Sequence, residues 1–365
     1  MVTHSQRAST PVLVSSYALG FIVFCLIVYI LSVAANILIP FVIAVFVWYL
    51  INAMARGLGR VKLGDTYLPR FLCFLFAMLV LIGGLWFVYK LISVNAVEVL
   101  RAAPVYQKKL MAFVPRIFSG LPPEYQVNPS DLGTYLDVGG FIKTMVTAFT
   151  GIAGKSLVVL FYVGFLLYEQ QFFGRKIQEM LREKSAENRI HKTIKTIEDK
   201  IQRYIWVKTF VSAVAGISTW LMLLAFNISF AEFWGVITFI LHFIPYAGAI
   251  AAVVLPSVAA LVQLGDMGDT TQLASLVLCL SAIQVFCTSF LDPRLTGDSL
   301  NLSPIVIISA IAAWGVLWGV PGMFLAVPIL SAAVIIMSQF QNTKAIAILM
   351  SKTGDIESHG AGKDA

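Results

Sequence analysis

The chain has 365 residues, of which 59% are hydrophobic and 12% are charged, against roughly 25% charged residues in soluble domains. This composition excludes an ordinary soluble protein and predicts an all-α, polytopic membrane protein with about eight apolar segments. The net charge of +7 does not indicate a nucleic-acid partner, because the basic residues gather in loops beside apolar runs, where the positive-inside rule accounts for them. The lipid bilayer is therefore the first expected partner.

The sequence contains no motif that would hold a nucleotide phosphate, a catalytic zinc ion or a nucleophilic serine. Its four histidines are scattered without metal-ligand spacing, and its four cysteines all lie inside apolar runs, where a thiol behaves as a small hydrophobic group. We therefore expect no enzyme activity, no cofactor, no metal site and no disulfide framework.

Residues 1–94 are predicted to form three membrane helices, at residues 17–35, 37–51 and 71–88. The first apolar run is too long for the core of a signal peptide, so we interpret it as a membrane helix. The loop after the second helix holds four basic residues and one acid, and this bias places the loop and the amino terminus on the cytoplasmic side. These loop residues are Arg56, Arg60, Lys62, Arg70 and Asp65.

The middle of the chain is predicted to alternate between the two sides of the membrane. Residues 95–143 hold five prolines and mixed charges, which predicts an extracytoplasmic cap of short helices that begins before Pro104. Residues 144–168 return as a fourth membrane helix. Residues 169–206 then form a cytoplasmic amphipathic helix, whose apolar stripe packs either on the protein's own cytoplasmic face or on another subunit of a homo-oligomer. The stripe consists of Ile190, Ile194, Ile197, Ile201 and Ile205.

Residues 207–341 are predicted to form a transport core. Two apolar runs within it, residues 229–264 and 303–341, are each nearly twice as long as one membrane crossing requires. Proline and glycine interrupt both runs, so each is predicted to fold back as a hairpin, and broken helices of this kind build solute sites in transporters. A membrane helix precedes each hairpin, and the loop charges give the two units opposite orientations, which predicts an inverted repeat. Residues 342–365 are expected to form a cytoplasmic tail, disordered from Ser351 onward.

The candidate pathway residues fall at the two breaks and on the helix between the hairpins. His242, one turn before the first break, is interpreted either as a proton or solute contact or as a neutral side chain bonded to a freed carbonyl. The helix between the hairpins carries a polar stripe that either binds a neighbouring helix or lines an aqueous path. The predicted pathway consists of His242, Pro245, Tyr246, Gly248, Ser281, Gln284, Thr288, Asp292, Gly319, Pro321 and Gly322.

Other charged and polar residues in these segments have simpler interpretations. Asp292 is expected to cap freed backbone amides or to pair with Arg294. Glu232 is expected to be a solvated acid at the start of a helix. The small and polar stripe that runs from Lys208 to Thr219 indicates close helix packing rather than solute contact.

Three segments occur in order along the last third of the chain: FIPYAG at 243–248, DPRLTGDSLNLSP at 292–304 and WGVPGMFLAVP at 318–328. These segments resemble the signatures of the AI-2E family of bacterial membrane transporters, sometimes called autoinducer-2 exporters. The resemblance implies a bacterial inner-membrane protein, export of autoinducer-2 in some members and sodium/proton antiport in others. The motif positions that we interpret as structural are Pro256, Pro293, Arg294, Gly297, Pro304 and Pro328.

The sequence departs from the common pattern of that family in several places. Ser303 stands where many members have histidine, Ala249 replaces a frequent proline, and Cys287 and Ser289 lie where acidic or amide residues are common. With fewer ionisable groups on this helix, the resemblance gives weaker support for coupling to a cation.

Three functions remain open from the sequence. The first is a secondary transporter that exports a small polar solute, autoinducer-2 being one candidate, bound by half-helix amino termini and unwound carbonyls. The second is a sodium/proton antiporter, with H⁺ or Na⁺ as the coupling ion and His242, Glu232 and Asp292 as the available titrating groups. The third is a membrane scaffold that transports nothing. Both termini are expected in the cytoplasm.

Overall fold

The computed structural model describes residues 10–59, 62–63, 66–67, 69–118, 140, 143–144, 147, 151, 154–180, 184–264, 270–296 and 301–354. Within these residues the fold is helical, apart from a small antiparallel pair of strands, β1 (Lys62–Leu63) and β2 (Thr66–Tyr67), in the basic loop. Seven helices are long and apolar enough to cross a membrane, and two shorter apolar helices accompany them. The all-α, multi-pass prediction is confirmed at this level.

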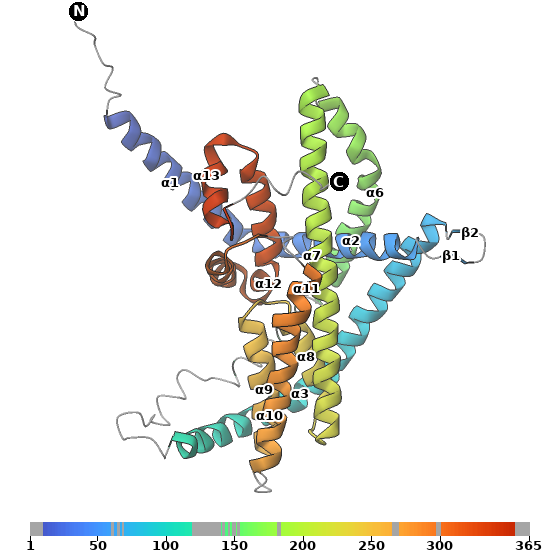
Figure 1. The fold of residues 1–365 in the computed structure, drawn as a ribbon, viewed down its shortest axis with the longest axis vertical. Coiled ribbons are helices and arrows are strands. Elements are labelled where there is room, and N and C mark those ends of the chain that lie inside the picture. The colour runs from blue at the N-terminus through green and yellow to red at the C-terminus, as the bar shows by residue number, and fades with distance from the viewer. Residues whose placement is uncertain are drawn as a thin grey trace, which may run out of the picture.

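The amino-terminal helices α1 (Thr10–Val33) and α2 (Ala35–Leu58) are separated by Ala34 alone. Helix α1 projects from the rest of the chain (Figure 1), and its described apolar side chains are mostly exposed, as on a surface that lipid covers. The carboxyl-terminal end of α1 is held by a hydrogen bond, in which the indole Nε1 of Trp318 donates to the carbonyl of Leu31 at 2.9 Å. Helix α2 instead packs on α3 and α6 through a buried row that includes Ala44, Val47 and Ile51.

Helix α3 (Arg70–Phe118) is much longer than predicted. The sequence suggested an end at residue 88 and a cap of short helices from residue 95, but the helix continues without a break through Pro104. Ile92 and Val99 of this extension are buried against α8 and α9, and the Lys109 Nζ donates to the carbonyl of Val262 at 2.9 Å. Tertiary packing therefore outweighs the local helix-breaking tendency of the proline. Most of residues 119–143 lie outside the described residues.

Helices α6 (Ser156–Met180) and α7 (Lys184–Ala225) replace the separate amphipathic helix that was predicted at residues 169–206. The first half of that segment continues the fourth apolar helix, and the second half joins the fifth into one long rod (Figure 1). No proline or glycine lies between Lys184 and Val207, so nothing in the sequence stops the helix from running on.

The last three isoleucines of the predicted stripe lie in α7 and pack on the chain's own carboxyl-terminal helices. Ile201 and Ile205 are buried and Ile197 is partly buried, in one cluster with side chains of α12 (Pro304–Ser338) and α13 (Gln341–Met350). This outcome favours the first of the two interpretations of the stripe. Residues 342–350 are accordingly helical, and Ser351 is buried and bridges to Leu302, whereas residues 355–365 lie outside the described residues.

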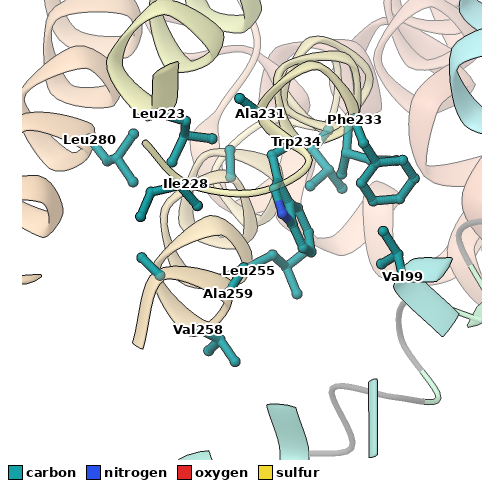
Figure 2. Packing of buried hydrophobic residues seen from close by; sticks show 14 of the residues in the cluster. Val99, Leu223, Ile228, Ala231, Phe233, Trp234, Leu255, Val258, Ala259 and Leu280 are labelled. Atoms are coloured by element: carbon teal, nitrogen blue, oxygen red, sulfur yellow. The ribbon is translucent and has the colours of Figure 1, made fainter. Parts of the chain in front are cut away.

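The first long apolar run forms two helices, α8 (Ala231–Leu241) and α9 (Ala247–Leu264), separated by a short break at residues 242–246. The two helices pack on each other, and the Gln263 side chain, near the end of α9, bonds the carbonyl of Asn227 and the amide of Ser229, just before α8. Figure 2 shows the apolar core around them, in which Trp234 lies against Leu255 and Ala259.

The helix that follows changes its winding before it ends. Helix α10 (Thr270–Val285) passes into a π-helical segment, η3 (Phe286–Leu291), and then into the short helix α11 (Asp292–Thr296). Pro293 is tolerated here because it occupies the first turn of α11, where a proline needs no amide partner. The chain then enters α12 with Pro304 in its first turn.

Helix α12 is broken at Gly319, whose φ of 64° and ψ of −143° are not helical. Side chains from its first part, Ile307 and Ala310, belong to the same cluster as Val327 and Val334 of its second part. The second apolar run is therefore also interrupted where proline and glycine predicted a break.

The two breaks share one close backbone approach. A Cβ on Gly248 would lie 1.8 Å from the carbonyl oxygen of Leu241, and a Cβ on Gly322 would lie 2.0 Å from that of Trp314. Hydrogen bonds from Ile244 N to Leu241 O (2.8 Å) and from Gly248 N to Ile244 O (3.0 Å) keep the first turn satisfied. Both turns thus depend on the absence of a side chain at one position.

We expect Gly248→Ala and Gly322→Ala to destabilise the protein by on the order of 1–3 kcal/mol, as overpacking does in a dense core. The matched control is Gly164→Ala in α6, where an added Cβ meets nothing within 4 Å; it should be neutral or raise stability by up to about 1 kcal/mol. Thermal unfolding in detergent measures both effects. Equal behaviour of all three variants would contradict the close approach.

Candidate functional site

The best-buried ion pair among the described residues joins α7 to the end of the π-helical segment. Lys208 of α7 is 4% exposed, and its Nζ lies 2.8 Å from Oδ2 of Asp292. The other carboxylate oxygen of Asp292 accepts a hydrogen bond from the Thr296 hydroxyl at 2.9 Å. The buried amine is tolerated beside the partly buried carboxylate because each compensates the charge of the other.

This pairing corrects both interpretations of Asp292 that the sequence suggested. The carboxylate neither caps freed amides nor binds Arg294, which is exposed in α11. Lys208 was assigned to a packing stripe and missed as a site residue. Close packing, the other part of that prediction, is found about two turns further along α7. A Cβ on Gly216 would lie 2.7 Å from the carbonyl oxygen of Gly235. The signal that could have found Lys208 is its charge within an apolar helix.

A second polar pair lies at the first break. His242 is 2% exposed and Gln284 of α10 is 4% exposed, and the imidazole Nδ1 lies 3.1 Å from the amide Oε1. Because that oxygen can only accept, Nδ1 is the donor and Nε2 is left as an acceptor. The simpler interpretation of the sequence was that a carbonyl freed at the break binds this histidine. In the structure the side chain of Gln284 binds it instead.

Eight buried side-chain atoms make no hydrogen bond within the described protein, among them Tyr204 Oη, Trp234 Nε1 and Ser257 Oγ. The other five come from α7, α8, the break and α10, and α7 packs on both α8 and α10. Leaving such an atom without a partner costs about 1–3 kcal/mol, so these groups require hydrogen bonds from water or from a bound solute. We call this set the polar cluster; it consists of Ser212 Oγ, Thr219 Oγ1, Thr238 Oγ1, His242 Nε2 and Gln284 Nε2.

The second break borders a cavity of about 160 Å³. Pro321 forms one wall, and the facing wall comes from α2 and from the region before and at the start of α6. Lys155 also lines the cavity, and its Nζ lies 2.9 Å from Oδ1 of Asn36. The remaining lining residues are Ile39, Pro40, Ile43, Thr147, Gly151 and Val159.

The structure does not bring all the predicted pathway residues together. The hydroxyl of Thr288 bonds the carbonyl of Gln284 at 2.7 Å, Ser281 is half-buried one turn before Gln284, and Tyr246 is exposed with a φ of 59°. Glu232 is exposed in the first turn of α8, as expected. Of the structural motif positions, Pro256 and Pro328 lie inside α9 and α12, Pro293, Arg294 and Pro304 lie in first turns or short helices, and Gly297 lies outside the described residues.

Among the described residues no three or more His, Cys, Asp or Glu side chains gather closely enough to hold a metal ion. The free thiols are likewise apart from one another, Cys73 and Cys287 being buried and Cys25 and Cys279 less so. What the site offers chemically is therefore hydrogen bonding and one compensated charge pair.

The sequence matches the family described as "AI-2E family transporter" over residues 19–342. It is 27% identical over 327 residues to the AI-2 transport protein TqsA of Escherichia coli K12, an alignment that covers 87% of this chain and 90% of that protein. Proteins of Borreliella burgdorferi and Haemophilus influenzae, whose names assign transport only provisionally, are each 24% identical; they cover 87% and 89% of this chain and 86% and 92% of their own length. The matched region includes every element of the site.

We expect Lys208→Ala to destabilise the protein by at least about 2 kcal/mol, because it leaves the Asp292 carboxylate without its partner. The double variant Lys208→Met/Asp292→Leu removes both charges and should recover a large part of that loss. The control is Arg175→Ala, which breaks an exposed pair with Glu179 and should change stability by less than about 1 kcal/mol. Denaturation in detergent measures the cycle, and additive single effects would show that the pair contributes nothing.

Proposed function

The chain belongs to the AI-2E transporter family, and on that premise we propose that it is a secondary transporter that exports a small polar solute, with autoinducer-2 as the first solute to test. Its family is one of transporters and not of enzymes. In this proposal the protein spans the bacterial inner membrane with both termini in the cytoplasm, as the charges of the loops favour.

The observation that carries the proposal is the polar cluster at the first break. Its hydroxyl and amide groups can donate, and the imidazole Nε2 can accept, so together they suit a solute that carries hydroxyl groups. The nearby charges of Lys208 and Asp292 compensate each other, so the site favours a solute without net charge. A binding site of this composition gains specificity because a solute that lacks the hydroxyls leaves buried atoms unpaired.

The two broken runs support the transport part of the proposal. In each, a glycine lies against the carbonyl of a residue seven or eight positions earlier, and residues from both sides of the break pack together. We propose that the runs are opposed hairpins of an inverted repeat that meet within the membrane. Interrupted helices at membrane depth are tolerated only where protein or water surrounds them, and transporters use them at solute sites.

Exchange of a proton or sodium ion is the second candidate function. It is favoured by the fact that Lys208, Asp292 and His242 interact electrostatically within the same core. Ionisable side chains in membrane helices often form proton relays. If cation exchange driven by a pH gradient persists after all three are replaced by neutral residues, this candidate fails.

In proteoliposomes we expect the protein to move autoinducer-2, and we expect His242→Ala and Gln284→Ala each to lower the rate about tenfold, since one hydrogen bond of about 1.4 kcal/mol corresponds to a factor of ten. Ser289→Ala is the control, because this exposed side chain lies on η3 away from the cluster.

Gradients of sodium and of protons are applied separately in this assay, and other small hydroxylated solutes are tested beside autoinducer-2. Movement of no solute under any gradient would count against the proposal and would favour a membrane scaffold. Transport that is insensitive to both substitutions would place the solute elsewhere.

A further inference from the structure

Four phenylalanine rings form a continuous aromatic cluster between the two breaks. The rings of Phe243 and Phe324 have centroids 4.6 Å apart. Phe46 lies against both, at 6.1 Å from Phe243 and 5.0 Å from Phe324, and Phe239 lies 5.5 Å from Phe243. We call these residues the phenylalanine cluster.

The rings come from three parts of the chain that are distant in sequence. Phe46 belongs to α2, Phe239 and Phe243 to the end of α8 and the break that follows it, and Phe324 to α12. Phe243 is the residue immediately after His242, and Phe324 is two residues after Gly322. In this cluster, side chains from both broken runs therefore touch each other.

The cavity at the second break and this cluster share helix α2 and the second broken run. On α2 the cavity residues Ile39 and Ile43 precede Phe46 by seven and three positions, a spacing that places all three on one face of the helix. Pro321, on the opposite wall, precedes Phe324 by three positions. The same two segments thus carry both the cavity lining and the rings of Phe46 and Phe324.

Phe243 of this cluster also follows His242 of the polar cluster directly in the chain. Phe243 is 5% exposed and its chain neighbour His242 holds Gln284. Phe46 shares α2 with one wall of the cavity and Phe243 follows His242 in the chain, so the rings connect the two sites. Apolar constrictions in membrane proteins act as gates because water does not occupy them stably.

We propose that the phenylalanine cluster is the gate between the cavity at Pro321 and the polar cluster at His242. The proposal rests on the proposed transport function. The rings close the route when they are in contact and open it when the second broken run moves relative to the first. Phe243 and Phe324 form the central contact of the gate, and Phe46 supports both from α2.

The test measures access to the polar cluster without requiring any solute. Ser212 is fully buried in α7, so a Ser212→Cys substitution provides a thiol within the polar cluster. Cys25 and Cys279, the less buried native thiols, are replaced by alanine. A membrane-impermeant methanethiosulfonate reagent is added to vesicles of either orientation, and the same protein with Ser212 intact gives the background.

We expect Phe324→Ala to raise the labelling rate at position 212 by at least about tenfold, because removal of a ring lets water through the constriction. The matched control is Phe41→Ala, which removes a ring of the same helix as Phe46 that contacts Tyr162 at 5.5 Å outside the cluster. It should leave the rate unchanged. An unchanged rate in Phe324→Ala, or an equal rise in both variants, would overturn the gate.

A second measurement covers the case in which Phe324→Ala does not fold. In a Phe243→Cys/Phe324→Cys variant, a short bifunctional thiol reagent should lock the two broken runs together, stop labelling at position 212 and stop transport, and a reductant should restore both. Labelling that continues at the same rate in the locked protein would overturn the gate. If the labelling results are as expected but no solute moves in any assay, the gate stands and the transport proposal fails.

Discussion

A chain that crosses a lipid bilayer can leave the helical conformation only where its freed amides and carbonyls find partners, and this requirement shapes the whole carboxyl-terminal half of the protein. At both breaks the chain turns so tightly that a glycine lies against a carbonyl from the preceding helix. At the first break, backbone hydrogen bonds from the amides of Ile244 and Gly248 close the turn. His242 of the polar cluster, Pro321 of the cavity and the contact of Phe243 with Phe324 all lie at or next to these two turns.

The sequence predicted the elements that depend on strong local signals. Proline with glycine in long apolar runs located both breaks to within a few residues, and apolar length identified the membrane helices. Prediction from the sequence failed where tertiary contacts decide how far a helix runs. The sequence suggested an end at residue 88 and short helices around Pro104, but burial of Ile92 and Val99 on α8 and α9 accompanies one helix that runs past both positions. The long rod of α7 was divided in two because its first half is amphipathic and its second half is apolar, although no residue between them stops a helix.

The site was predicted in part for the same reason. His242 and Gln284 were both named, but nothing in one sequence states that a histidine before one break meets an amide 42 residues later. Lys208 was missed because it stands at the head of a small and polar stripe, and the stripe does pack closely around Gly216. The pairing of Lys208 with Asp292 joins residues 84 positions apart, and a local spacing rule favoured the nearby Arg294 instead.

The π-helical segment η3 explains how the predicted polar stripe reaches as far as Asp292. Gln284 and Asp292 are eight residues apart, and in an uninterrupted α-helix of 3.6 residues per turn their directions would differ by about 80°. A π-turn takes up one extra residue, so the two positions behave as if they were about seven residues apart, close to two full turns. The π-helical winding of Phe286–Leu291 therefore determines whether Gln284 and Asp292 lie on the same face of the helix.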